Sequence, residues 1–368
     1  MSKGHKTIRV DNIVNNYDHT DGGWCWTKYG VCPYMGCSYD CAYCYNLGYS
    51  ADNQVQVKNN AVSMLQKELK TLPKDVVTIG DYQPAETELR LIREMLKVIQ
   101  DAGFPLHIIE KSPLVTEDLD LISQIGKKSW AAVSISVTAA PSLPDLDKAL
   151  LKYEPETSTA AERFAAMAKI ASAGILTGTS CVPLIPYIGD AMLNIEELIK
   201  ATKEAGGKYF LIGALVVPQP FDDDFWDITE EHFPDQAVKL QRLYDPENTE
   251  KFNEYFGNLD RKTTKLCAKY GILDHIPRPV DFYSGKIRMN KILAEQFYLK
   301  SRFSKSNRQP QEMELTYLAL AWLLDDLPGD ISAEYQKKGD EALAAYGLED
   351  DMIKELAAVI NEELSAGK

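Results

Sequence analysis

Residues Gly36–Tyr45 read GCSYDCAYCY and bring three cysteines together in the spacing C-x3-C-x2-C. Cysteine thiolates bind zinc ions and iron–sulfur clusters, and closed zinc sites and ferredoxin-type clusters both take four protein ligands. Here Cys37, Cys41 and Cys44 supply three. The spacing therefore predicts a metal cluster in which one metal atom is left open to bind another molecule.

Other interpretations of the cysteines are open. Disulfides are disfavoured because Cys41 and Cys44 are too close for an ordinary structural disulfide, and nothing marks the chain as secreted. A zinc site would need a fourth ligand, from Cys32 or Cys25. Cys25 and Cys32, together with Cys267, are also candidates for an auxiliary cluster, and the alternative is that they pack near an N-terminal cap.

The chain has 368 residues, of which 45% are hydrophobic, so it can form one large domain or a barrel with an appendage. The polar N-terminal residues do not form a secretion signal, and no apolar run has the length of a membrane span. We therefore expect a soluble, cytoplasmic protein. Seven cysteines, an odd count, in such a protein indicate metal or catalytic chemistry.

Charge is unevenly distributed along the chain. The net charge of −14 argues against a general polyanion-binding protein, because such proteins use Lys and Arg to displace counterions. Residues 311–368 contain fourteen acidic and four basic residues, whereas the stretch Lys286–Arg308 contains seven basic residues and one acidic residue. Nucleic-acid binding through Lys286–Arg308 therefore stays open.

Strand-like and helix-like segments alternate after the cysteines, which predicts βαβ units with parallel strands. The expected strands are Tyr29–Val31, Val76–Ile79, Leu106–Ile109, Ala131–Val137, Ile175–Leu184 and Tyr209–Val217. The expected helices between them are Ala85–Ala102, Thr116–Ile125, Thr159–Ala173 and Ile195–Ala205. Right-handed crossovers curl such a series into a barrel or partial barrel, so we expect an α/β fold of this type.

Beyond the last expected strand the pattern changes. Pro218–Pro234 is expected to be a loop, and the remaining chain is mostly helical. We expect a core with an N-terminal cap over residues 1–220 and loops and helices that close the barrel over 221–310. Residues 311–368 are expected to form an acidic helical appendage, with helices over Glu314–Leu324, Ala333–Tyr346 and Asp350–Leu364.

Polar residues follow or end several expected strands, where barrels of this kind carry their working groups. After the second strand comes the segment Gly80–Glu86. Its glycine lets a ligand approach the backbone closely, and its acidic side chains can accept hydrogen bonds from an amino group of that ligand. Lys111 follows the third strand and can pair with a carboxylate. Ser134 and Ser136 in the fourth strand point to the same side, because side chains alternate along a strand. Arg163, on the helix that follows, is a second candidate for a carboxylate.

These motifs occur in an order that resembles the spore photoproduct lyase-like branch of the radical S-adenosylmethionine (SAM) superfamily, over roughly residues 24–220. The motifs are CSYDCAYCY, DYQPAE, KSPL, VSISV, YEP with Arg163, and VPLIP. The resemblance implies a partial (β/α)6 TIM-type barrel and an oxygen-sensitive enzyme. It also implies an electron donor such as a low-potential ferredoxin or flavodoxin.

The same resemblance implies roles for individual residues. Cys37, Cys41 and Cys44 would hold a 4Fe–4S cluster whose open iron binds SAM. Lys111 and Ser134 or Ser136 would hold polar groups of SAM, and Tyr43 would lie near its adenine. We add Gly80, Glu86 and Arg163 as candidate cofactor-binding residues. The cleaved SAM would yield a radical that removes hydrogen from a substrate, either a nucleic-acid base or a peptide or small metabolite.

One departure from the family limits the comparison. Spore photoproduct lyase has a hydrogen-donor cysteine at the end of its second strand, where this chain reads Ile79-Gly80-Asp81. We do not expect the same repair reaction. Cys181 is a candidate hydrogen donor, although a single cysteine in an apolar strand is often a small core residue. Asp81 and Tyr82 are further candidate catalytic residues. The alternative to an enzyme is a non-catalytic zinc or iron–sulfur binding module.

Overall fold

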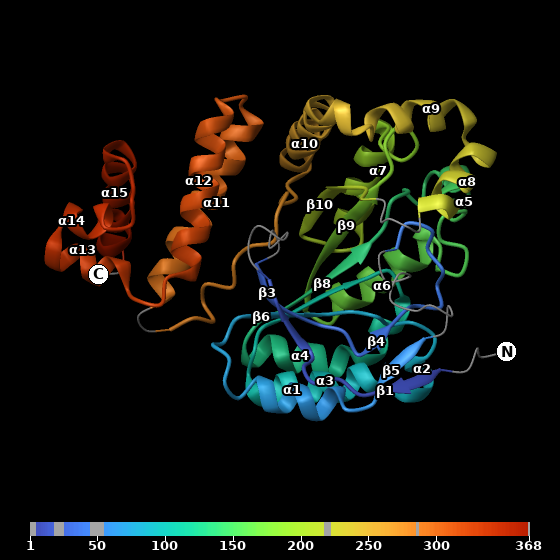
Figure 1. Ribbon diagram of the computed structural model, residues 1–368, viewed down its shortest axis with the longest axis horizontal. Helices are drawn as coiled ribbons and strands as arrows, with labels where there is room; N and C mark the ends of the chain where they lie inside the picture. The colour runs from blue at the N-terminus through green and yellow to red at the C-terminus, as the bar shows by residue number, and fades with distance from the viewer. Residues whose placement is uncertain (1–4, 18–25, 45–54, 217–221, 285–286, 367–368) are drawn as a thin grey trace. The chain divides into compact units, whose positions relative to one another are not determined.

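A computed structural model describes residues 5–17, 26–44, 55–216, 222–284 and 287–366 (Figure 1). The chain divides into two compact units, Met1–Ile276 and Pro277–Lys368. The expected boundary at residue 220 falls inside the first unit, and the one at residue 310 falls inside the second. No helix among the described residues is both long enough and apolar enough to cross a membrane.

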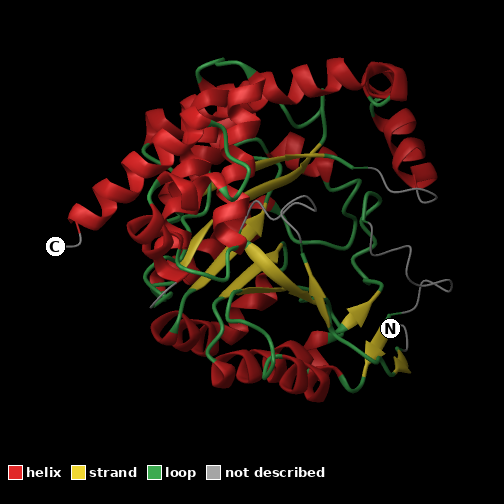
Figure 2. Ribbon diagram, turned by 60° about the vertical axis from the view of Figure 1, so that its left-hand side comes forward, coloured by secondary structure: helices red, strands yellow, loops and turns green. Residues whose placement is uncertain are grey.

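The first unit is built on a sheet of parallel strands, which Figure 2 shows in yellow. Its strand order is β10-β9-β8-β7-β6-β3-β2. The six parallel strands are β3 (Thr27–Val31), β6 (Val76–Ile79), β7 (Leu106–Glu110), β8 (Ala131–Ser136), β9 (Leu176–Leu184) and β10 (Tyr209–Ala214). All six expected strands are present and lie side by side in sequence order. The prediction of an α/β fold with partial (β/α)6 barrel topology is therefore confirmed.

An antiparallel strand, β2 (Val14–Asn16), borders β3 at one end of this sheet. A separate small sheet has the order β1-β5-β4, formed by Lys6–Ile8, Gln56–Lys58 and Tyr34–Met35. Its strand β4 lies immediately before the cysteine segment. The cysteine segment therefore begins directly after a strand of the small sheet.

Helices lie between the strands along the chain. They are α1 (Ala61–Glu68), α2 (Glu86–Leu89), α3 (Leu91–Ala102), α4 (Leu119–Lys128), α5 (Pro144–Leu150), α6 (Ala160–Ser172) and α7 (Met192–Glu204). Among them, α4, α6 and α7 contact the parallel sheet. The apolar stripe of α3 is buried, at Ile92, Met95, Leu96 and Ile99, as the sequence pattern predicts. The expected helix Ala85–Ala102 is interrupted at Arg90, which has a φ of 50°.

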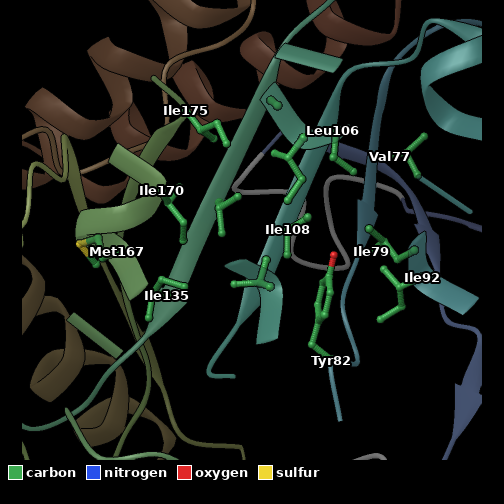
Figure 3. Close-up of a cluster of buried hydrophobic side chains, with 14 of the residues drawn as sticks. Val77, Ile79, Tyr82, Ile92, Leu106, Ile108, Ile135, Met167, Ile170 and Ile175 are labelled. Carbon is green, nitrogen blue, oxygen red and sulfur yellow. The ribbon is translucent and has the colours of Figure 1, made fainter. Parts of the chain in front are cut away.

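Buried aliphatic side chains fill the space between sheet and helices, and Figure 3 shows part of this core. Ile79, Ile108 and Ile135 come from three neighbouring strands, while Ile92 and Ile170 come from helices. Every residue of β8 is buried, because a parallel strand covered on both faces has no solvent side. The core thus fixes the strands whose ends carry the polar motifs.

The pairing register brings the carboxyl ends of the strands to one edge. Val31 pairs with Ile79, and Ile79 pairs with Ile108. Ser136, the last residue of β8, pairs with Ser180 of β9. Residues that follow paired positions lie at similar depths, so segments distant in sequence meet above this edge.

The prediction of a loop over Pro218–Pro234 is wrong for the residues that the structure describes. Helix α8 spans Asp222–His232, and α9 (Pro234–Leu243) follows it. Acidic residues such as Asp223 and Asp224 favour a helix N-terminus, and Pro234 suits the first turn of α9. The first unit ends with α10 (Thr249–Tyr270), which packs beside α7.

The second unit is helical. It consists of α11 (Arg288–Ser306), α12 (Gln311–Asp326), α13 (Ile331–Lys338), α14 (Asp340–Ala344) and α15 (Asp350–Ala366). The expected helices of the appendage are present, with a break at Gly339, whose φ is 61°. Inside the unit Asp325 forms ion pairs with Arg278 and Lys291, at 2.8 and 3.1 Å.

Two glycines of the first unit provide a matched stability test. A Cβ at Gly178 would lie 2.2 Å from the carbonyl oxygen of Tyr209 on the paired strand, whereas a Cβ at Gly126 in α4 meets only Ala131 at 3.4 Å. We expect Gly178→Ala to lower the free energy of unfolding by about 1–3 kcal/mol or more. Gly126→Ala should raise it by about 0.5–1 kcal/mol, since alanine favours the helix. Urea unfolding followed by circular dichroism measures both, and equal effects would contradict the strand packing.

Candidate functional site

A cavity of about 510 Å³ lies at the carboxyl ends of the parallel strands. Its wall comes from the cysteine segment and from residues at or just after the ends of β3, β6, β7, β8, β9 and β10. The candidate site residues that line it are Cys37, Cys41, Tyr43, Cys44, Gly80, Asp81, Tyr82, Lys111 and Ser136. Motifs that are far apart in sequence therefore meet around one space.

Gln83, in the loop after β6, forms hydrogen bonds to the cysteine segment, and the sequence alone suggested no role for it. The amide of Gln83 is fully buried; its Nε2 donates to the carbonyl of Gly36 at 3.1 Å, and its Oε1 accepts from the backbone N–H of Ser38 at 3.2 Å. Gln83 lies inside the DYQPAE motif, which was the only signal for it. The contact fixes the backbone on both sides of Cys37.

The three cysteines of the motif line the cavity, and they differ in how deeply they are buried. Cys41 is buried, and Cys37 and Cys44 are partly exposed. Burial raises the pKa of the Cys41 thiol to about 12 and also raises that of Cys37. Metal binding deprotonates such thiols, so loading the site must release protons.

The donor set fits an iron–sulfur cluster. In the part of the chain that the structure describes, no three His, Cys, Asp or Glu side chains converge as the ligands of one metal ion do. The cysteines of a 4Fe–4S cluster bind separate iron atoms, so they need to surround a common space without meeting at one point. Cys37, Cys41 and Cys44 line one cavity in this way.

A buried ionic network lies beside Cys41. The Lys111 ammonium is 3.0 Å from the hydroxyl of Tyr43 and 3.1 Å from Oε1 of Glu154. The Tyr43 hydroxyl donates to the same carboxylate, and Arg163 donates to its other oxygen. Burial alone would raise the pKa of Glu154, but Lys111 and Arg163 hold it well below its usual range. The carboxylate is therefore charged and bridges two cations.

Glu154 had no assigned role in the sequence analysis, although it stands in the YEP motif. Its partners are 9, 43 and 111 residues away in sequence, so no local pattern indicates them. Arg163 is buried behind the cavity wall, where it also donates to the carbonyls of Ser136 and Ser158, both at 2.9 Å. It supports the wall without lining it.

Three other candidate residues do not line the cavity. Ser134 is buried between Nε2 of His107 and the hydroxyl of Tyr209, each 2.8 Å away, so of the two serines Ser136 is the one at the cavity. Glu86 is buried and accepts from Tyr34 and from the backbone N–H of Ile92.

Cys181 is the third of these residues. It is fully buried within β9, paired with Ile212 of β10. Val182 and Pro183, which follow it, do line the cavity. Burial raises the pKa of the Cys181 thiol to about 12.

The cavity wall also contains a thiol and a carboxyl group outside the cysteine motif. Cys32 follows Val31, the residue paired with Ile79, and its thiol is hydrogen-bonded to Asp81. Asp81 has a φ of 73°, a left-handed conformation that aspartate tolerates better than most residues. Burial and then the charge of Glu110 raise the pKa of Asp81 to about 7.

The remaining candidates are Tyr82, Cys267, Cys25 and Lys286. Tyr82 adjoins the cavity, but its hydroxyl donates to Asp118 at 3.0 Å and its ring belongs to the core (Figure 3). Cys267 is buried in α10. Cys25 lies outside the described residues, as does Lys286.

The basic stretch of α11 is largely paired with acidic residues of the same unit. The ion pairs are Arg288 with Asp281, Lys291 with Asp325, Lys300 with Glu355, and Lys305 with Glu314. Paired cations offer less charge to a phosphate backbone than free ones do.

The pKa of Asp81 generates a test on the protein without cofactors. Folded Asp81 keeps its proton up to about pH 7, while the unfolded chain releases it near pH 3.8, so this residue lowers stability as pH rises through that window. Asp81→Asn should match the parent near pH 4 and be more stable above pH 8, by up to about 4 kcal/mol. Urea unfolding at both pH values measures the difference. Asp101→Asn, on the exposed face of α3, controls for loss of a surface charge, and an Asp81→Asn effect that does not change with pH would contradict the assignment.

Comparison with known proteins gives relatives without assigned function. No protein-family model matches the chain. Uncharacterized proteins of Mycobacterium tuberculosis and Mycobacterium bovis are each 27% identical over 271 residues, covering 68% of this chain and 77% of theirs. An uncharacterized protein of Methanocaldococcus jannaschii is 28% identical over 192 residues, covering 50% of this chain and 69% of its own.

Comparison of structures identifies the fold. A variant of spore photoproduct lyase, solved with bound AdoMet and dinucleoside spore photoproduct, superposes with a TM-score of 0.51 at 16% identity, covering 73% of this chain and 80% of that one. A second variant of the same enzyme gives a TM-score of 0.51 at 15% identity, covering 73% and 81%. The chain therefore has the fold of spore photoproduct lyase.

Proposed function

We propose that this protein is a radical SAM enzyme. The observation that carries the proposal is the meeting of three thiols and the Lys111 ammonium around one cavity at the carboxyl ends of the parallel strands. The likeness in fold to spore photoproduct lyase supports the same reading. A bound 4Fe–4S cluster, once reduced, would supply the electron that cleaves SAM to a 5′-deoxyadenosyl radical.

Within this proposal each wall of the cavity has a separate role. Cys37, Cys41 and Cys44 bind the cluster through their thiolates. Lys111 and Ser136 bind polar groups of SAM, and Tyr43 orients Lys111 through its hydroxyl. Supporting contacts come from Gln83 and Glu154, which hold the cysteine segment and Lys111 in place.

Asp81 and Cys32 are proposed to face the substrate. Asp81 can hold a proton on its carboxyl group near neutral pH, and its thiol partner Cys32 lines the same space. A thiol can give a hydrogen atom to a substrate radical only where the two meet, so Cys32, which lines the cavity, is a better candidate than the enclosed Cys181. The electron donor is proposed to be a low-potential ferredoxin or flavodoxin.

Replacement of the motif cysteines tests the cluster. We expect anaerobically reconstituted protein to contain about four iron and four sulfide per chain. With dithionite it should convert SAM to 5′-deoxyadenosine. Alanine at Cys37, Cys41 or Cys44 should abolish both, while Cys267→Ala should retain both because that thiol lies apart in α10. Iron and sulfide analysis and chromatography of the nucleoside measure the outcomes.

Two results would contradict the proposal. Zinc without iron or sulfide, lost on Cys32→Ala, would instead establish the non-catalytic zinc module. A cluster whose spectrum is unchanged by SAM, and which a fourth cysteine is needed to hold, would establish an electron-transfer site.

The proposed substrate is an organic molecule, either a nucleic-acid base or a peptide or small metabolite, that is recognised mainly inside the cavity. The ion pairs of α11 reduce the charge that the basic stretch can offer to a nucleic acid. They therefore support recognition of the substrate inside the cavity. The net charge of −14 supports the same choice.

A triple substitution in the basic stretch Lys286–Arg308 distinguishes these modes of recognition. Replacing Arg302, Lys305 and Arg308 with Gln should change the salt dependence of oligonucleotide binding by less than one unit of slope, since no phosphate contacts are expected there. Fluorescence anisotropy with a labelled single-stranded oligonucleotide over a salt series measures this slope. A decrease of two to three, roughly 0.7–0.9 per lost phosphate contact, would instead assign α11 to nucleic-acid binding.

A further inference from the structure

The Lys111 ammonium lies against the sulfur of one motif cysteine. Its Nζ is 3.7 Å from Sγ of Cys41, within the range of an N–H···S hydrogen bond. The same nitrogen contacts the Tyr43 hydroxyl at 3.0 Å and lies 4.9 Å from the centre of that ring. The lysine side chain is 19% exposed, so the cation is held at the cavity wall and does not extend into solvent.

Both ends of Lys111 are fixed by one segment. Glu154 accepts from the ammonium at 3.1 Å, and the hydroxyl of Ser158 donates to the Lys111 carbonyl at 2.9 Å. Glu154 is itself held by Arg163 and by the hydroxyl of Thr157, the latter at 3.1 Å. The position of the ammonium beside Cys41 is therefore set by buried contacts on two sides.

Charged groups of both signs lie beside Cys41. Lys111 and Arg163 are two cations, and Glu154 is the one carboxylate they share. Burial and the neighbouring carboxylate raise the pKa of Tyr43 well above its usual value, so its hydroxyl stays neutral. The nearby Glu110 carboxyl accepts backbone N–H groups of Tyr82 and Lys111. The Lys111 ammonium is the cation in contact with the Cys41 sulfur.

We propose that Lys111 raises the reduction potential of a cluster bound at Cys41, by donating a hydrogen bond to the sulfur and by its charge. The inference rests on the proposed function, and it adds a second role to the expected binding of SAM by Lys111. Reduction adds one negative charge to a cluster, and a cation a few ångströms away stabilises that charge most strongly where water is excluded. Hydrogen bonds to cluster sulfurs act in the same direction.

The test is a redox titration without SAM, so that loss of SAM binding does not affect the result. Parent, Lys111→Met and Lys111→Arg proteins are reconstituted, and the reduced cluster is followed by electron paramagnetic resonance at poised potentials. In Lys111→Met the one-electron equilibrium should shift at least tenfold toward the oxidised cluster, which is a fall of about 59 mV. Lys111→Arg keeps the charge, and its equilibrium should stay within threefold of the parent.

Controls separate this effect from a change in folding. Lys97→Met removes an exposed lysine of α3 and should leave the potential unchanged. If Lys111→Met does not fold, Lys111→Gln, which keeps an N–H donor for Glu154, should show the same tenfold shift. A four-iron cluster with an unshifted potential in the neutral variant would overturn the inference and leave the proposed function standing. A parent protein that binds no cluster would overturn both.

Discussion

Glu154 lies between Lys111 and Arg163, and its side chain connects several of the segments that surround the cavity. A carboxylate removed from water is stable only when it is paired and hydrogen-bonded, and Glu154 has both cations and two hydroxyl donors. Through these contacts it joins the cysteine segment, the loop after β7 and the start of α6. Removing it would leave two buried cations with one fewer partner, a change that costs more than the pair itself contributes.

The network also explains why a small set of strand ends can form a working site. Each strand supplies only one or two polar groups, and the sheet register brings them to similar depth. Gln83 and Glu154 then connect segments that the sheet alone would leave independent. The cavity wall is therefore a property of the tertiary structure more than of any single motif.

The sequence was sufficient to predict the parallel strands and the buried face of α3, because burial leaves a periodic apolar pattern and glycine marks a helix end such as Gly103. It was not sufficient to separate Ser134 from Ser136. Alternation assigns both serines to one side of β8, but it does not say that His107 and Tyr209 already occupy the space in front of Ser134. The roles assigned to the cavity residues stay predictions.

Two further misses have physical causes. The helix α8 was expected to be a loop because proline, acidic and aromatic residues are frequent in irregular segments, yet acidic residues also stabilise a helix N-terminus. Cys181 was expected to be a candidate hydrogen donor because it is an isolated thiol in an apolar strand. Its place in the ladder, opposite Ile212 and before the strand end, was not readable from alternation alone.

The hydrogen-bonded chain His107–Ser134–Tyr209 has a consequence for how the sheet is assembled. It links side chains of β7, β8 and β10 inside the first unit. Apolar burial cannot distinguish the native pairing from one shifted by two residues, since such a shift keeps every side chain on its own face. A shifted sheet would leave these buried polar groups without partners, at about 1–3 kcal/mol for each. These three polar side chains thus favour one strand register. That register sets the level at which each strand ends beneath the cavity.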